Sequence, residues 1–98
     1  MKTEPKASIL DGVTIVDLTS VVFGPLATQM LGELGADVIK VEHPRGDVLR
    51  HTGYLKDGVG LWSKMTNRNK RCITLNFSHA KGQELFKELI KTTDVLIE

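Results

Sequence analysis

The sequence predicts an α/β fold in which helices flank a parallel, Rossmann-like sheet. Short apolar runs rich in β-branched residues alternate with helical patterns along the chain. The resulting order is strand, helix, strand, loop, strand, helix, strand, and connections through a helix favour parallel strands with right-handed crossovers. Doubly wound sheets bind ligands outside the carboxyl ends of their strands, so the segments that follow the strands are the candidate site.

Local signals mark the first strand and helix. The run Val13–Leu18 follows the turn signal Asp11-Gly12 and predicts a buried strand. Gly24-Pro25 places a proline at the expected first helical position. Gly35 then suits the left-handed residue that ends a helix. The apolar face between them comprises Leu26, Met30, Leu31 and Leu34.

The middle of the chain predicts two further strands around an irregular segment. Val38–Glu42 reads as the second strand, and the alternation in Arg71–Phe77 indicates the third. Residues 43–69 are interrupted by glycine and proline, with a short helix expected around Leu61–Thr66. Cys72 falls within the third strand, where we expect a small buried hydrophobe and not a nucleophile.

A second long helix and a fourth strand complete the pattern. Ser78 is the expected N-cap of the helix. Its buried face is predicted to hold Leu85, Phe86, Leu89 and Ile90. Asp94–Glu98 then begins a strand with no turn after it. We therefore expect an incomplete, amino-terminal part of a larger domain.

Composition excludes several classes of protein. The 98 residues carry a formal net charge of +1, with 41% hydrophobic and 26% charged residues, as in an ordinary globular domain. Neither nucleic acid nor a membrane is indicated as a partner, because basic residues are dispersed and no apolar run reaches the roughly 18 residues that span a bilayer. A single cysteine fits a reducing, cytoplasmic location. We expect residues 1–8 to be a flexible tail and residues 9–98 to be one domain.

The first two strand ends offer alternative chemistries. Residues 19–24 could shape a pocket wall or simply connect strand to helix, and they lack the G-x-G-x-x-G fingerprint of a dinucleotide site. Glu42 nevertheless imitates the acidic residue that binds a nicotinamide cofactor's ribose, so a small NAD- or nucleotide-binding module is an alternative. The carboxylate could instead pair with Arg45 or Arg50. Arg45 and His43 could bind a phosphate, or lie on a surface turn.

The third strand has candidates at both ends. The basic segment Asn67–Arg71 could neutralise phosphate or pair with nearby carboxylates. At the exit, Leu75 or Phe77 could form an apolar wall for adenine, and Asn76 or Ser78 could supply hydrogen bonds. The other interpretation places Phe77 in the core and Ser78 only at the helix cap. The histidines lie in no metal-ligand spacing, so no metal is expected.

Read together, these segments resemble the amino terminus of the class III coenzyme A transferase family, which includes formyl-CoA and carnitine CoA-transferases and α-methylacyl-CoA racemase. The resemblance runs from Leu10 to Glu98. The matching segments are Leu10–Val13, Val16–Thr19, Gly24-Pro25, Thr28–Met30, Leu34–Glu42, Asn69–Arg71, Leu75-Asn76 and Thr93–Glu98.

The resemblance implies an enzyme that moves CoA between an acyl-CoA thioester and a carboxylic acid. It implies CoA or acyl-CoA as substrate with no tightly bound cofactor, and a full-length protein that forms an interlocked homodimer. The family's nucleophilic aspartate lies downstream, so no catalytic residue is expected within this chain, which alone should be inactive. Racemase activity on acyl-CoA is the alternative within the family.

Carried over by position, the family's CoA contacts fall on Val22, Phe23, His43, Leu75, Asn76, Phe77 and Ser78. Two positions depart from formyl-CoA transferase. That enzyme has glutamine where Val22 stands, which counts against formate or oxalate as substrate. It has arginine where His43 stands, so a phosphate contact is expected to shift to Arg45.

Overall fold

The computed structural model describes residues 8–98. The expected tail, residues 1–8, therefore lies outside the described residues except for Ser8. The carbonyl oxygen of Ser8 accepts a hydrogen bond of 3.1 Å from the Asp11 amide. An added Cβ on Gly35 would lie 2.3 Å from the Ser8 Cβ, so Ser8 packs closely against the end of the first helix.

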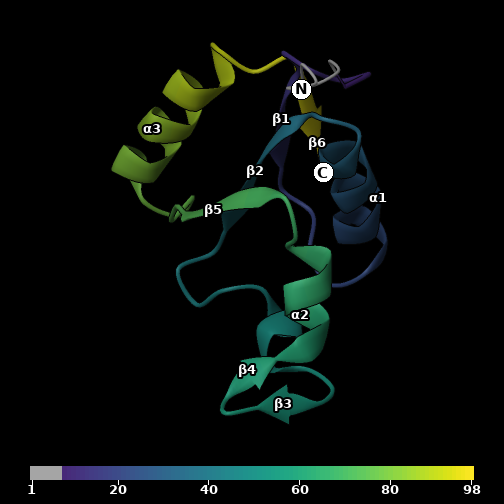
Figure 1. Cartoon of the computed structure of the whole chain (residues 1–98). Helices are drawn as coiled ribbons and strands as arrows, with labels where there is room; N and C mark the ends of the chain where they lie inside the picture. Colours follow the sequence, from purple (N-terminus) through teal and green to yellow (C-terminus); the bar gives the residue numbers. More distant parts are fainter. Residues whose placement is uncertain (1–7) are drawn as a thin grey trace.

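Four parallel strands form the sheet at the centre of the molecule (Figure 1). Their order across the sheet is β5-β2-β1-β6, so β2 and β5 are added on one side of β1 and β6 on the other. The strands are β1 (Thr14–Asp17), β2 (Asp37–Glu42), β5 (Lys70–Thr74) and β6 (Val95–Ile97). The predicted parallel α/β architecture is confirmed, and all four predicted strands are present.

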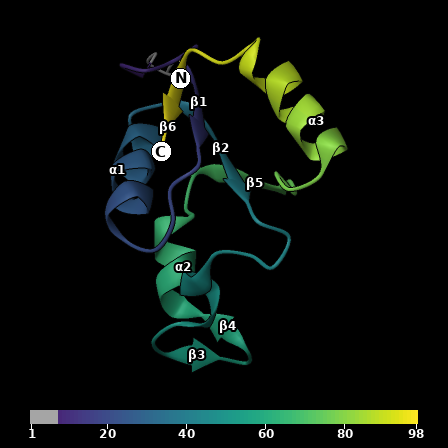
Figure 2. The same cartoon turned by 180° about the vertical axis from the view of Figure 1, so that it is seen from behind.

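One long helix packs on each face of this sheet. Figures 1 and 2 show α1 (Phe23–Glu33) and α3 (Ala80–Ile90) on opposite sides. The α1 side holds the buried cluster Ile15, Ala36 and Val38, with Leu31 packed against it. The α3 side holds Val16, Ile39 and Val41, with Phe86, Leu89 and Ile90 packed against them. The two clusters follow from the two-residue period of the strands.

The ends of α1 show where the sequence signal was right and where it was wrong. Gly35 has φ of 105°, its amide bonds to the Gly32 carbonyl, and the Ala36 amide bonds to the Leu31 carbonyl. These two bonds form a Schellman motif and confirm the predicted glycine end. Pro25, in contrast, is the third helical residue and not the first. It is tolerated there because the amides of the first turn have no helical partner.

The segment between β2 and β5 is more regular than predicted. It contains the 3₁₀ helix η1 (Val48–His51) and the expected short helix α2 (Leu61–Thr66). Between them, β3 (Leu55–Lys56) and β4 (Val59–Gly60) form a hairpin at the far end of the molecule (Figure 1). The hairpin was not predicted, although Asp57-Gly58, with both φ angles positive, is a common two-residue hairpin turn.

Four expectations around β5 and α3 are wrong. The strand ends at Thr74 and not Phe77, because the Asn76 side chain accepts a hydrogen bond from the Ser78 amide and turns the chain. The N-cap of α3 is His79 and not Ser78, since the His79 Nδ1 accepts from the Lys81 amide. Cys72 is exposed in the described chain, and so is Leu85.

Gly82 lets the backbone of α3 lie close to the backbone of Asn76. A substitution at this position therefore tests the packing of the helix. An added Cβ would lie 2.0 Å from the Asn76 carbonyl oxygen, which is backbone and cannot move alone. We predict that Gly82→Ala lowers the free energy of unfolding by roughly 1–2 kcal/mol despite the better helix propensity of alanine. Urea unfolding followed by circular dichroism measures the change. The exposed Lys87→Ala on the same helix is the control, and equal midpoints for both variants would contradict the prediction.

Candidate functional site

A pocket of about 300 Å³ lies at the carboxyl ends of neighbouring parallel strands. Three segments that are distant in sequence form it: the turn after β1, the loop after β2, and the exit of β5 at Phe77. The lining residues are Leu18, Thr19, Ser20, Val41, Glu42, His43, Gly46, Asp47, Val48 and Phe77. The volume is at the lower end of the usual range for small-molecule sites.

Two of the predicted contact residues, His43 and Phe77, line this pocket. Phe77 also packs edge-on against Phe86 of α3, with ring centroids 5.0 Å apart. His43 is exposed, and its Nδ1 accepts a hydrogen bond of 3.1 Å from the Arg45 amide. The aromatic ring is therefore anchored in the fold, whereas the imidazole sits at the open rim.

The other predicted residues do not line the pocket. Val22 is the half-buried N-cap of α1, and Phe23 beside it is 92% exposed. Arg45 is exposed on the loop after β2. Leu75 packs against the apolar cluster on the α3 side, while Asn76 and Ser78 are exposed in the turn that leads to α3.

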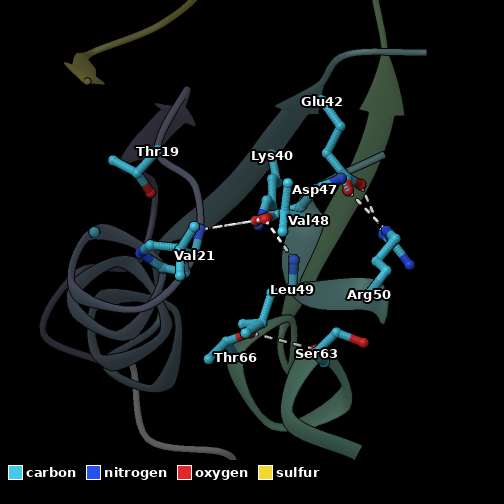
Figure 3. A network of polar contacts seen from close by, with 12 residues as sticks. Thr19, Val21, Lys40, Glu42, Asp47, Val48, Leu49, Arg50, Ser63 and Thr66 are labelled. Atoms are coloured by element: carbon cyan, nitrogen blue, oxygen red, sulfur yellow. Dashed lines mark hydrogen bonds and ion pairs between the residues drawn. The ribbon is translucent and has the colours of Figure 1, made fainter. Parts of the chain in front are cut away.

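Asp47 is the most highly connected group of the pocket wall (Figure 3). Its carboxylate is 2.6 Å from the Nζ of Lys40, a lysine that is 1% exposed. It also accepts hydrogen bonds from the backbone amides of Leu49, at 3.0 Å, and Val21, at 3.2 Å to each oxygen. Burial raises the pKa of Asp47, but the Leu49 amide and the Lys40 ammonium outweigh it, so the pKa is lowered overall.

Glu42 is a buried carboxylate held by an arginine. The Nε and one terminal nitrogen of Arg50 each lie 2.7 Å from a Glu42 oxygen, which is a bidentate pair (Figure 3). The Asp47 amide donates a third bond of 2.8 Å to the same carboxylate. Arg50 lowers the pKa of Glu42 against the opposing effect of burial. Of the two partners considered for Glu42, the structure therefore selects Arg50.

A second buried pair lies under the turn after β1. The Asp17 side chain, at the end of β1, accepts from the hydroxyl of Thr28 at 2.6 Å and from the Nζ of Lys70 at 3.1 Å. The amide and hydroxyl of Thr19 also donate to it. Burial raises the pKa of Asp17, but the hydrogen bonds from Thr19 and Thr28 outweigh it and lower the pKa. Burial lowers the pKa of Lys70, and Asp17 offsets this only in part.

The basic segment Asn67–Arg71, which leads into β5, pairs with carboxylates. Arg68 bonds to Glu33 of α1, and Arg71 lies 2.6 Å from Asp37 of β2. With Lys70 paired to Asp17, each charged side chain of this segment has a carboxylate partner. Of the two interpretations of the segment, pairing with nearby carboxylates is the one observed.

Of the two interpretations of residues 19–24, the pocket wall is the one observed, because Thr19 and Ser20 line the pocket. Asp47 was missed from the sequence as a pocket residue. One available signal was Lys40, a lysine in the middle of an apolar strand. Such a residue requires a buried acidic partner when both faces of the sheet are covered. Nothing in the sequence indicated that Gly24 must stay small. An added Cβ there would lie 2.2 Å from the Thr19 Cβ, so glycine lets the turn fold back on α1.

Within residues 8–98, no group of three or more histidine, cysteine, aspartate or glutamate side chains is arranged to hold a metal ion. No helix in this part of the chain has the length and apolar character needed to cross a membrane.

Comparison with protein families gives a match over residues 10–98 to the model described as CoA-transferase family III. A formyl-CoA:oxalate CoA-transferase of Streptomyces coelicolor is 46% identical over 93 residues, which are 94% of this chain and 23% of that protein. One from Rhodopseudomonas palustris is 53% identical over 93 residues, 91% of this chain and 21% of that protein. The beta subunit of a succinyl-CoA–L-malate CoA-transferase of Chloroflexus aurantiacus is 46% identical over 91 residues, 91% and 22% of the two chains.

Solved structures agree with the sequence relatives. A CAIB/BAIF family protein from Brucella suis has a TM-score of 0.86 at 40% identity, with 95% of this chain and 26% of that chain covered. A hypothetical protein from Mycobacterium tuberculosis has a TM-score of 0.85 at 36% identity, with 94% and 25% covered. The chain thus spans about a fifth to a quarter of the length of the proteins it matches.

The Glu42–Arg50 pair predicts a dependence of stability on pH. Because the folded state holds the pKa of Glu42 below its ordinary value of 4.5, the pair stabilises the protein fully above that pH. Its contribution falls as the pH drops below about 4.5, when protonation favours the unfolded chain. We predict that Glu42→Gln lowers the urea midpoint at pH 7 but much less at pH 3. Asp57→Asn, in the exposed hairpin turn, is the control, and a constant Glu42→Gln effect across this range would contradict the assignment.

Proposed function

The chain belongs to CoA-transferase family III, and from that premise we propose that it forms part of the CoA site of an acyl-CoA:carboxylate CoA-transferase. The reaction moves CoA between an acyl-CoA thioester and a carboxylic acid. CoA is here a substrate, and we expect no tightly bound cofactor. The proposal includes the chain being the amino-terminal part of such an enzyme, which fits its coverage of its relatives.

The observation that supports this function best is the convergence of three strand ends on one pocket. Phe77 supplies an aromatic wall of the kind on which an adenine ring stacks. His43 and Arg45 stand at and beside the rim, where they can meet phosphate groups from solvent. Val22, Phe23, Leu75, Asn76 and Ser78 remain proposed contacts for the rest of the bound CoA.

The state of Glu42 argues against NAD binding. A ribose diol needs a carboxylate with open acceptor positions. Both oxygens of Glu42 are occupied by Arg50, and one also accepts from the Asp47 amide. The turn after β1 also lacks the glycines that bring backbone amides to a pyrophosphate. The nucleotide module is therefore the weaker proposal.

The nucleophile that the reaction requires is proposed to lie outside this chain. In the proposed mechanism an aspartate attacks the thioester carbonyl, the carbon–sulfur bond breaks, and CoA leaves as the thiolate. Asp47 at the pocket and Asp17 beneath it are both ion-paired to buried lysines and hydrogen-bonded, so neither is available for attack. We expect the 98 residues alone to be catalytically inactive.

The relatives do not by themselves identify the acyl donor and the acceptor acid of this protein. Several relatives are formyl-CoA:oxalate enzymes and one acts with succinyl-CoA and L-malate. Val22 cannot make the hydrogen bond of the glutamine found in formyl-CoA transferase, which counts against formate and oxalate. These relatives favour transfer over the racemase alternative.

A cytoplasmic homodimer is part of the proposal. Several large apolar side chains are exposed, including Phe23 at 92%, Tyr54 at 80% and Val48 at 68%. Exposure on this scale is unusual for a complete monomer and typical of surfaces that other chain segments cover. In the interlocked dimer of this family, downstream segments and the second subunit would provide that cover.

Binding by the 98-residue chain provides the first test of the proposed function. We predict that isothermal titration calorimetry detects CoA binding and at least tenfold weaker binding of NAD. The matched variant Phe77→Ala should weaken CoA binding by about tenfold through loss of base stacking, worth about 1–3 kcal/mol. NAD binding tighter than CoA binding would overturn the assignment.

A test of CoA transfer itself requires a complete enzyme. Residues 10–98 can replace the matched segment of the Streptomyces coelicolor relative. We predict that this chimera transfers CoA and accumulates a covalent acyl or CoA adduct on a downstream aspartate, seen by mass spectrometry during turnover. The relative lacking the segment is the negative control. A chimera that racemises an acyl-CoA without any adduct would move the assignment to the racemase branch.

A further inference from the structure

Val21 has a backbone conformation that its side chain disfavours. Its φ is 68°, in the left-handed region, where a β-branched residue is a clear outlier. The side chain is 41% exposed, so burial of the side chain gives little compensation. A residue in this region persists only where its surroundings hold it there, and such positions gather at functional sites.

The Asp47 carboxylate is the group that holds Val21. The Val21 amide donates to both Asp47 oxygens at 3.2 Å, and Figure 3 shows the carboxylate lying between Val21 and Leu49. An amide shared evenly between two oxygens is oriented by both of them. The turn after β1 is thereby tied to a residue 26 positions later in the chain.

Asp47 is itself fixed from the sheet side. Lys40 of β2 lies 2.6 Å from its Oδ2, and the Asp47 amide donates to Glu42, the last residue of β2. The Leu49 amide donates a hydrogen bond of 3.0 Å to the Oδ1 of the same carboxylate. The carboxylate therefore has a position set by β2, and it transmits that position to Val21.

The bond joins two of the three walls of the pocket. Thr19 and Ser20 line it from the turn that Val21 ends, and Gly46, Asp47 and Val48 line it from the loop after β2. Release of Val21 would let the first wall relax away from the second. Val22 and Phe23, the proposed CoA contacts, follow directly in the chain.

We propose that Asp47 is a positioning residue for CoA binding. Its carboxylate acts by holding the amide of Val21 and makes no direct contact with the bound CoA. This inference rests on the proposed function for its ligand. Its carboxylate already accepts from Lys40, Leu49 and Val21, which leaves no open acceptor direction for a ligand donor. Its role is to keep the strained turn in the conformation that forms the pocket wall.

Two paired substitutions separate positioning from charge. Replacing Asp47 alone would strand the buried Lys40 charge and unfold the site, so each variant also carries Lys40→Met. Lys40→Met/Asp47→Asn keeps a side-chain carbonyl that can accept from Val21. Lys40→Met/Asp47→Leu has a similar shape but no acceptor. Both remove the same two charges, so a difference between them reports the hydrogen bonds that the side chain accepts from the Val21 and Leu49 amides, and amide exchange at Val21 isolates the first of these.

We predict that the asparagine variant of the 98-residue chain binds CoA within about threefold of the unsubstituted chain, whereas the leucine variant binds about tenfold more weakly. In NMR hydrogen exchange without ligand, the Val21 amide should stay protected with asparagine and exchange at least tenfold faster with leucine. Both variants should be folded without urea and unfold in a single transition, which excludes global unfolding as the cause; the midpoint of the leucine variant should be the lower one, because the Val21 and Leu49 amides lose their acceptor.

Equal CoA affinities for the two variants, whether both normal or both weakened, would overturn the positioning role. Unchanged protection of Val21 in the leucine variant would do the same. The exchange measurement needs no ligand, so it tests the Val21–Asp47 bond even if the unsubstituted chain binds no CoA. Failure of the unsubstituted chain to bind CoA would count against the proposed function and not against the Val21–Asp47 hydrogen bond.

Discussion

Two lysines buried in a parallel sheet impose the main constraint on this structure. Lys40 is 1% exposed, and the Lys70 side chain has no exposed surface. An unpaired ammonium in such a position would cost several kcal/mol, so each must meet a carboxylate. Asp47 and Asp17 meet that need, and their positions determine where the loop after β2 and the turn after β1 can run.

The buried ion pairs also determine the backbone conformation of the turn after β1. Since Asp47 is drawn toward Lys40, its carboxylate reaches the Val21 amide and holds that residue in a left-handed conformation. Since Thr19 is drawn onto Asp17, the turn folds back until Thr19 meets α1, and only glycine fits at position 24. The polar side of the pocket is thus a consequence of satisfying buried charges.

The sequence predicted the architecture well because the relevant signals are local. Apolar runs, the Gly35 helix end and the Leu61–Thr66 helix depend on residues close in the chain. The site was predicted only in part, through His43, Phe77 and the turn of residues 19–24, because its organisation depends on pairs such as Val21 with Asp47, 26 residues apart. The N-cap of α3 is His79 instead of Ser78, because Ser78 lies in the turn closed by the Asn76 side chain, a local competition between adjacent polar residues that the sequence pattern did not resolve.

The alternation of the strands gives the pocket two unlike walls. Residues on the α1 side, Lys40 and Glu42 among them, carry the ion pairs, whereas Val41 belongs to the apolar cluster on the α3 side. Leu18 packs against that same cluster, and Phe77 packs against Phe86 of α3, so the apolar wall of the pocket is continuous with the core. The polar wall is charge-balanced, because Arg50 and Lys40 neutralise the two carboxylates that line it. For the proposed CoA ligand, this arrangement favours an orientation with the adenine ring against the α3 side and the phosphates toward His43.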